Sequence, residues 1–187
     1  MNVLIVGPQG AGKGTQAARI AEEYGIPHVA TGDLYREHIA NETELGKLVE
    51  PYLRDGQLVP DEVTIPIVKS EIIERGENGF VLDGYPRNLA QAEALDEMLE
   101  EIERPLSIIL LLELDDDVAR ARLLERARTD DTPDVIDRRL ATYHETTEPI
   151  VEHYLATGKL VKVHAERTID EVWAEISEAL EQVQARA

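Results

Sequence analysis

Short apolar runs alternate with helical patterns along the whole 187-residue chain. The first, third and fourth runs are almost continuously apolar, as strands buried on both faces should be. This alternation is typical of a parallel sheet with helices on both of its faces. The runs predict strands at 2–6, 27–31, 79–83, 106–114 and 159–164, and the patterns between them predict helices at 13–24, 33–42, 61–75, 88–102, 115–127, 133–156 and 168–185. The long helical segment 32–78 has room for a small subdomain mounted on the sheet.

The glycine-rich stretch VGPQGAGKGTQ (residues 6–16) joins the first predicted strand to the first predicted helix. Free backbone N–H groups and the helix dipole attract anions at such a helix start. The glycines let the backbone approach phosphate oxygens, Lys13 can reach the outer phosphates, and the Thr15 hydroxyl can face them or their Mg²⁺. The usual motif, GxxxxGK[ST], has Ser or Thr directly after the lysine, whereas Gly14 intervenes here. A dinucleotide-binding GxGxxG does not fit, because after Gly10 and Gly12 the third glycine comes one position early.

The acidic composition restricts the partners of this chain. It has 38 Asp and Glu against 19 Lys and Arg, a formal net charge of −19. No nucleic-acid partner is expected, because phosphate backbones require a basic face. The acidity has two interpretations that stay open, an ordinary solvated surface or adaptation to high salt.

Other features of the composition bear on the compartment. There is no cysteine, which excludes disulfides and thiolate metal sites. No apolar stretch approaches the roughly 20 residues that a membrane span needs, and the chain opens directly into a predicted strand rather than a signal peptide. We therefore expect a cytoplasmic protein with no membrane partner.

The third predicted strand ends in LDGYPR (82–87). An acidic residue that leaves a buried strand beside a phosphate loop is placed to hold Mg²⁺, directly or through water. Asp-Gly is also a common turn pair, but Arg87, four residues further on, favours the metal-site interpretation of Asp83.

Four motifs occur in order along the chain: GPQGAGKGT (7–15), TGDLYR (31–36), DGYPR (83–87) and RARTDDTPDVIDRRL (126–140). Together they resemble the nucleoside monophosphate kinases, and most closely the adenylate kinase family of short-lid type. The resemblance implies one α/β P-loop domain with a three-layer fold and a five-stranded parallel sheet. It further implies a core of 1–30, 60–125 and 133–187, a small helical AMP-binding insert at 31–59 and a short lid at 126–132.

The same resemblance implies an activity, the reversible Mg²⁺-dependent transfer of the γ-phosphate of ATP to AMP, giving two ADP. ATP and AMP are then the expected partners and a monomer the expected state. The chain has neither cysteine nor room for the long lid of many relatives, so no zinc is expected.

Two alternatives to an adenylate kinase are a UMP/CMP kinase and, in a different class, a P-loop nucleotide-binding switch. In the family pattern the pyrimidine enzymes tend to have Ala and Asn at the positions of Thr31 and Gln91, so both residues favour AMP. The glutamine amide presents a donor and an acceptor that can pair with the N6 and N1 edge of adenine. The Asn-Lys pair with which guanine-reading switches begin their base-binding motif does not occur.

The resemblance also assigns roles to individual residues. The expected catalytic residues are Lys13, Arg87, Arg122, Arg126, Arg128 and Arg139. The expected ATP site comprises Gly10, Ala11, Gly12, Lys13, Gly14, Thr15, Arg126 and Arg167, the last through its backbone at the adenine. The expected AMP site comprises Thr31, Arg36, Gln57, Leu58, Val59, Gly84, Tyr85, Pro86, Arg87, Gln91, Arg128 and Arg139, with Arg36 and Arg87 on the phosphate. Mg²⁺ is expected with ATP, near Thr15 and Asp83, with no direct protein ligand assigned.

Helical periodicity separates two kinds of arginine. Arg122 and Arg126 are four residues apart and share one helix face, from which Arg120 points away. Arg139 flanks the apolar stripe of its predicted helix, whereas Arg138 faces the opposite side. We therefore interpret Arg120 and Arg138 as solvated surface charges paired with acids nearby in the helix.

A few remaining residues have local interpretations. Asp130 and Asp131 come just before the helix that starts at residue 133 and are predicted to cap it, with a further role in orienting Arg128. Pro149 lies inside a helical pattern and predicts a kink. Trp173 is predicted to pack in the core, and the five histidines, which lack metal-like spacing, are interpreted as structural or surface residues.

Overall fold

The computed structural model describes residues 1–185 and contains a five-stranded sheet in the order β2-β3-β1-β4-β5, with every pairing parallel. The predicted α/β fold with a five-stranded parallel sheet is therefore confirmed. The strands are β1 (Asn2–Val6), β2 (His28–Ala30), β3 (Phe80–Asp83), β4 (Ile108–Glu113) and β5 (Leu160–His164). The helices are α1 (Lys13–Tyr24), α2 (Thr31–Ala40), α3 (Glu44–Arg54), α4 (Asp61–Arg75), α5 (Leu89–Glu101), α6 (Asp116–Arg126), α7 (Pro133–Thr142), α8 (Ile150–Leu155) and α9 (Ile169–Gln184), with a π-helical turn η1 (Tyr143–Thr147) between α7 and α8.

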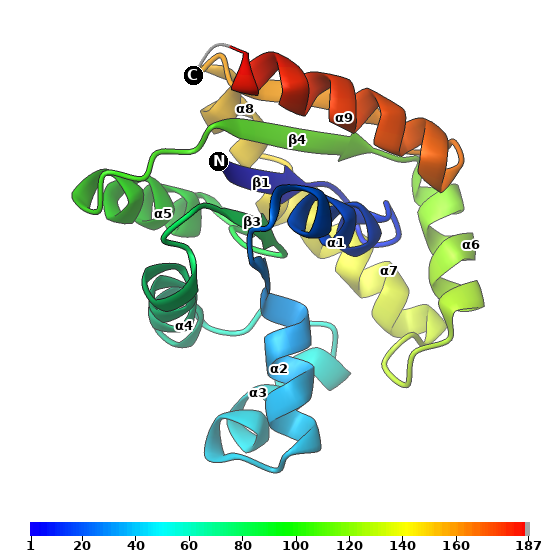
Figure 1. Cartoon of the computed structure of the whole chain (residues 1–187). Helices are drawn as coiled ribbons and strands as arrows, with labels where there is room; N and C mark the ends of the chain where they lie inside the picture. The colour runs from blue at the N-terminus through cyan, green and yellow to red at the C-terminus, as the bar shows by residue number, and fades with distance from the viewer. Residues whose placement is uncertain (186–187) are drawn as a thin grey trace.

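Side chains alternate between two cores, one on each face of the sheet. Along β1, Val3 and Ile5 pack on the face covered by α1 and α9, whereas Leu4 and Val6 pack on the face covered by α4, α5 and α8 (Figure 1). All four side chains are buried, and burying an aliphatic side chain of this size contributes about 1.5–3 kcal/mol. This double burial explains the almost continuously apolar strands.

Parallel pairing brings the polar ends of the strands to one edge of the sheet. Ile5 of β1 lies opposite Asp83 of β3, so the loop that follows Val6 begins beside the Asp83 carboxylate. In sheets of this kind, ligands bind outside the carboxyl ends of the strands. The register of β1 and β3 therefore positions the candidate site.

The segment 32–78 resolves into three helices, of which α2 and α3 extend away from the sheet (Figure 1). They share a small core in which Tyr35, Val49 and Val59 are buried. The Thr43 hydroxyl accepts a 3.0 Å hydrogen bond from the Gly46 N–H and so caps α3. The helices predicted at 33–42 and 61–75 correspond to α2 and α4, whereas α3 was not predicted as a separate helix.

The single helix predicted at 133–156 is interrupted, as Pro149 led us to expect. Proline lacks an N–H and its ring clashes with the carbonyl four residues earlier. The backbone accommodates it by widening into η1, where the Glu148 N–H donates to the Tyr143 carbonyl, five residues back, at 2.8 Å. The helix resumes at Ile150 as α8.

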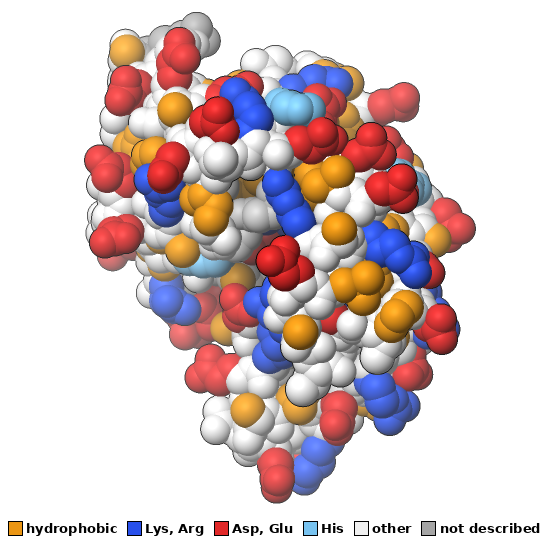
Figure 2. All heavy atoms as spheres, turned by 90° about the vertical axis from the view of Figure 1, so that its right-hand side faces the viewer, with side chains coloured by type: hydrophobic (Ala, Val, Ile, Leu, Met, Phe, Trp, Pro, Cys, Tyr) orange, Lys and Arg blue, Asp and Glu red, His pale blue; other side chains and the backbone are white. Residues whose placement is uncertain are grey.

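The outer surface is rich in acidic side chains, which are scattered among fewer basic ones on the face shown in Figure 2. Trp173 is partly buried and packs against the core under α1 and α9, as predicted. Within residues 1–185, every helix is too short or too polar to cross a membrane.

Candidate active site

The phosphate loop connects β1 to α1 and has the backbone conformation that the glycines predict. Gly10 has a φ of +88°, and a Cβ at this position would lie 2.8 Å from the Ala119 carbonyl oxygen of α6. Any side chain there would meet both backbone strain and a collision. The loop thus packs against α6 and leaves the N–H groups of the first turn of α1 without intrahelical partners.

Lys13, the first residue of α1, lies over this loop. Its ammonium group donates 2.8 Å hydrogen bonds to the Gly7 and Pro8 carbonyls. Burial lowers the pKa of Lys13 to about 8, the charge of Asp83 opposes this shift, and the charges of Arg87 and Arg126 add to it. A nucleotide phosphate that takes the place of these neutral carbonyls would stabilise the cation.

Asp83 ends β3 beside the loop, and a Cβ on Gly14 would lie 3.4 Å from its Oδ2 atom. Burial alone would raise its pKa, but His28, Lys13 and Arg87 outweigh that effect and hold the pKa of Asp83 below its ordinary value. His28 Nε2 lies 3.6 Å from Asp83 Oδ2 and, within residues 1–185, is buried without a hydrogen-bond partner. The site therefore holds an anionic carboxylate next to the phosphate loop.

Arg36 and Arg87 reach the cavity from α2 and from the loop after β3. Arg87 Nε donates to the Gly84 carbonyl at 2.7 Å, and burial lowers the pKa of its guanidinium. Arg36 forms an ion pair with Asp33, one turn back in α2. Thr31 is buried, and its hydroxyl donates to the same Gly84 carbonyl at 2.9 Å.

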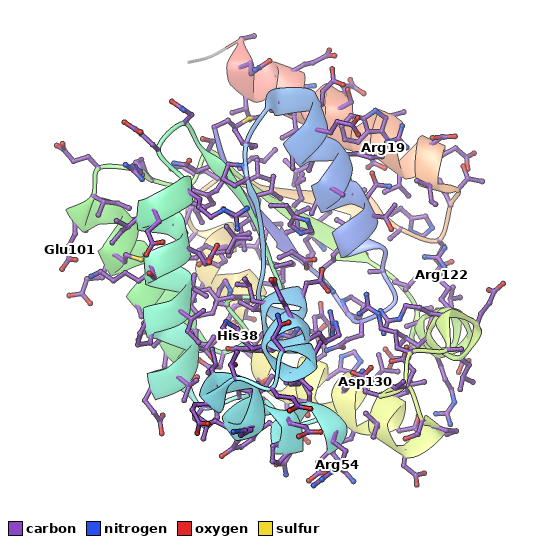
Figure 3. All side chains as sticks on the ribbon, turned by 60° about the horizontal axis from the view of Figure 1, so that its bottom comes forward. Arg19, His38, Arg54, Glu101, Arg122 and Asp130 are labelled. Carbon is purple, nitrogen blue, oxygen red and sulfur yellow. The ribbon has the colours of Figure 1, made fainter. Side chains whose placement is uncertain are left out.

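Arg122 and Arg126 lie along one face of α6 and line the cavity, as their spacing predicted. Arg122 Nη1 donates to the Ala165 carbonyl at 2.8 Å, and in Figure 3 its side chain lies on the α6 side of the phosphate loop. Arg126 forms a two-point ion pair with Asp131, through Nε to Oδ2 and Nη2 to Oδ1, both at 2.9 Å.

The segment between α6 and α7 departs from its predicted capping role. No side chain caps α7, and the prediction that Asp130 and Asp131 are N-caps is wrong. Asp131 is fully buried at its side chain and binds both Arg126 and Arg139, while Asp130 binds Arg139 and appears beside α7 in Figure 3. Burial alone would raise the pKa of Asp130, but Arg139 holds it below its ordinary value. Each of these carboxylates is paired with at least one guanidinium, as charges removed from water require.

Arg128 and Arg139 complete the arginines of the cavity. Arg139 Nη2 also donates to the Leu53 carbonyl at the end of α3, at 3.1 Å. Burial lowers the pKa of Arg128, and its backbone N–H donates to Asp131 Oδ2 at 3.3 Å, so Asp131 helps to place this residue as expected.

The two arginines interpreted as surface charges are exposed or half-buried, but their partners differ from those expected. Arg120 pairs with Asp137 of α7 rather than with an acid of its own helix. Arg138 donates to the Asp55 carbonyl just after α3. Both contacts connect separate elements, which spacing within one helix could not indicate.

One cavity of about 620 Å³ collects most of the predicted site residues. His28 also lines it, although the sequence interpretation treated the histidines as structural or surface residues. The sequence offered a signal, because His28 lies in the predicted strand 27–31, which ends at the predicted site residue Thr31. The predicted residues that line the cavity are Gly10, Gly12, Lys13, Gly14, Thr15, Thr31, Arg36, Gln57, Leu58, Val59, Asp83, Gly84, Arg87, Gln91, Arg122, Arg126, Arg128 and Arg139.

Four predicted residues lie outside this cavity. Ala11 is buried behind the loop, and Tyr85 and Pro86 line a separate space of about 20 Å³ next to Arg87. Arg167 follows β5, where its Nε donates to the His164 carbonyl and its guanidinium pairs with Glu175.

Comparison with known proteins agrees with this geometry. The family model described as adenylate kinase matches residues 5–159. An adenylate kinase of Synechococcus sp. (strain RCC307) is 48% identical over 178 residues, covering 95% of this chain and 97% of the relative. One of Bifidobacterium longum (strain NCC 2705) is 47% identical over 186 residues, covering 97% of this chain and 100% of the relative. The chain belongs to the adenylate kinase family.

Proposed function

We propose that this protein catalyses the reversible transfer of the γ-phosphate of ATP to AMP, giving two ADP. The observation that carries the proposal is that one cavity joins the phosphate loop to arginines of α2, α6, α7 and the loop after β3. Two phosphorylated ligands that meet end to end require cations on both sides of the transferred group. A protein that binds a single nucleotide would need no second set of cationic side chains.

The arrangement suits phosphoryl transfer, which depends on positioning and charge neutralisation rather than on a covalent nucleophile. Lys13, with Arg122 and Arg126, would bind the outer phosphates of ATP. Arg36 and Arg87 would bind the phosphate of AMP. Arg128 and Arg139, held by Asp130 and Asp131, would contact the transferred group from the other side.

The oxygen donors beside the loop fit Mg²⁺. The Thr15 hydroxyl lines the cavity, and Asp83 is a buried carboxylate whose pKa is held low, so both offer the hard oxygen ligands that Mg²⁺ prefers. When bound there, Mg²⁺ would help to neutralise the charge of the phosphates. We propose that Thr15 and Asp83 hold it, directly or through water, and that no zinc is required.

We also propose how the chain divides into a core, an insert and a lid. Residues 31–59 would act as the AMP-binding insert and residues 126–132 as a short lid, mounted on a core of 1–30, 60–125 and 133–187, whose last two residues lie outside those described. The separate small core under α2 and α3 supports an insert that moves as a unit. Closure of both parts would exclude water from the transferred phosphate.

The remaining expectations concern partners and location. We propose a monomer, because one chain supplies both the phosphate loop and the arginines that the two nucleotides need. The net charge of −19 argues against nucleic acid and anionic membranes as partners, and the absence of cysteine suits the reducing cytoplasm, where we place the protein.

A coupled assay with MgATP and AMP, CMP, UMP or GMP tests the proposed function. We expect kcat/KM to be highest for AMP, because Thr31 and Gln91 line the cavity on the side of Arg87. Higher kcat/KM for CMP or UMP would establish the pyrimidine kinase instead. ATP binding without transfer to any monophosphate would indicate a nucleotide-binding module.

A further inference from the structure

Asp61 connects the starts of two helices next to the proposed AMP site. It is the first residue of α4, and its Oδ1 atom accepts hydrogen bonds from Gln91 Nε2 at 2.7 Å and from Asn88 Nδ2 at 3.0 Å. Its Oδ2 atom accepts from Asn88 Nδ2 at 3.2 Å. Asn88 in turn caps α5, because its Oδ1 atom accepts from the Gln91 N–H at 2.8 Å. A carboxylate thus holds both amide side chains at the entrance to α5.

The other end of the Gln91 amide is fixed as well. Its Oε1 atom accepts a 2.7 Å hydrogen bond from the Arg87 N–H, and the residue is only 2% exposed. An ionised carboxylate can only accept and a backbone N–H can only donate. Turning the amide over would set oxygen against oxygen at Asp61 and N–H against N–H at Arg87. One orientation of Gln91 is therefore enforced from both sides.

The enforced orientation leaves hydrogen-bonding capacity free. A primary amide has two donor hydrogens and two acceptor lone pairs, and Asp61 and Arg87 use one of each. One donor and one acceptor remain in a cavity-lining side chain. Adenine offers a donor at its 6-amino group beside an unprotonated ring nitrogen, whereas guanine and hypoxanthine offer an acceptor oxygen at position 6. One orientation of the amide therefore matches adenine, and the inverted orientation matches guanine and hypoxanthine.

We propose that Asp61 is a specificity-determining positioning residue, which fixes the Gln91 amide so that the site accepts adenine and rejects 6-oxopurine monophosphates. The inference rests on the proposed function, since it requires that Gln91 reads the base of the monophosphate. Asp61 need not touch the nucleotide, because it acts through Gln91. Rejection follows from the polar groups that a wrong base would leave unpaired in a buried site.

The test uses AMP and its 6-oxo counterpart IMP, which present opposite hydrogen-bonding patterns at position 6. In Asp61→Asn the new amide can donate to Gln91, so an inverted Gln91 loses one of its two conflicts. We expect the AMP-to-IMP ratio of kcat/KM to fall about tenfold, through KM for the monophosphate, while KM for ATP stays unchanged. Asp61→Ala, which removes the acceptor, is the second variant should Asp61→Asn not fold. A merely structural role would lower both kcat/KM values together and leave their ratio intact.

Two further variants make the outcomes distinct. Glu62→Gln is the matched control, because it removes the neighbouring exposed carboxylate from the same first turn of α4. Its ratio should equal that of the wild type. Gln91→Leu should lose the preference for AMP.

Three results would overturn the inference. If Gln91→Leu loses the preference and the Asp61 variants keep the wild-type ratio, the inference is wrong and the proposed function stands. The same holds if Gln91→Leu retains the preference, since the base is then read elsewhere. A wild-type enzyme with no preference for AMP among the monophosphates would overturn the proposed function and this inference together.

Discussion

Lys13 gives the sharpest residue-scale test of the site, because its ammonium is held by loop carbonyls and makes no ion pair with an acid within residues 1–185. We predict that Lys13→Ala folds normally and loses about 10²–10³-fold in kcat, since it removes a charge that the transition state needs. Turnover is measured with saturating ATP and AMP, and folding by the thermal midpoint.

Lys47→Ala is the matched control for that variant. Lys47 lies on an exposed face of α3, where it pairs with Glu44, so its loss removes the same charge from outside the phosphate loop. Its turnover should stay near the wild-type value. Near-normal turnover in Lys13→Ala would exclude the proposed role.

Residue identity and spacing predicted the charged groups of the site but not their partners. The shared orientation of Arg122 and Arg126 could be predicted because a helix places residues four apart on one face. The role of Asp131 could not be predicted in this way. Its position before a helix suggested a local cap, whereas its contacts with Arg126 and Arg139 depend on how α6 and α7 pack against each other. Asp61 was missed for the same reason, since Gln91 lies 30 residues away along the chain.

At the scale of elements, α7 packs against the end of the proposed insert at Gly56. This residue has a φ of +69°, and a Cβ there would lie 3.1 Å from Val135 Cγ1 and 3.2 Å from the Val135 carbonyl oxygen. Gly56→Ala should therefore incur about 1–2 kcal/mol of backbone strain, and the new methyl group should also push α3 away from α7. We expect a lower thermal midpoint and a raised KM for AMP.

Gly25→Ala is the control that separates the packing effect in Gly56→Ala from the backbone strain. Gly25 ends α1 with a φ of +62°, and a Cβ there would meet nothing within 4 Å. It should show the strain alone, so the two variants should differ by about 1–3 kcal/mol in the free energy of unfolding. Equal destabilisation would mean that the contact with Val135 does not constrain the insert.

His144 connects α6 to the π-helical turn and makes the stability of the fold depend on pH. Its Nδ1 lies 2.9 Å from Glu148 and its Nε2 lies 2.9 Å from Asp116, and these hydrogen bonds raise the pKa of His144 above 6.5. A raised folded-state pKa stabilises fully below about pH 6.5, and the stabilisation is lost as the pH rises through the folded value. The effect should stay below about 1 kcal/mol, because the side chain is 44% exposed.

We predict that His144→Gln flattens the fall of the thermal midpoint as the pH rises above about 6.5. The control is His164→Gln, which removes an exposed imidazole 3.9 Å from Glu166 and should leave the wild-type pH dependence in place. An unchanged slope in His144→Gln would show that these two carboxylates do not stabilise the fold.

The alternation of elements was predictable, whereas the breaks within helices were only partly so. The first, third and fourth strands were identified by apolar runs buried on both faces, and all five predicted strands agree with the observed ones to within about two residues. Pro149 predicted a kink, but the form it takes, a widened turn over Tyr143–Thr147, depends on how the backbone relieves the clash. The helix α3 escaped prediction because it packs against α2 rather than against the sheet.

At the scale of the whole molecule, positive charge is concentrated in the cavity and negative charge lies outside it. Among residues 1–185, seven basic residues line the cavity, whereas Asp33 and Asp83 are the acidic residues that do. The surface outside is therefore more acidic than the net charge of −19 suggests. This separation favours nucleotide phosphates locally, while acidic side chains predominate over basic ones on the outer face shown in Figure 2.

That predominance makes the salt dependence of stability the test of the two open interpretations of the acidity. Each exposed contact contributes only about 0–1 kcal/mol, so repulsion summed over 19 excess acidic charges matters only if it becomes comparable with a stability of about 5–15 kcal/mol. Screening shortens from about 10 Å at 0.1 M salt to about 3 Å at 1 M, so adaptation to high salt predicts a thermal midpoint that rises between low and molar KCl. Sulfate is unsuitable, because it strengthens apolar burial and can occupy the phosphate loop. A midpoint that stays flat or falls in KCl would reject salt adaptation and leave the acidity as a property of an ordinary solvated surface.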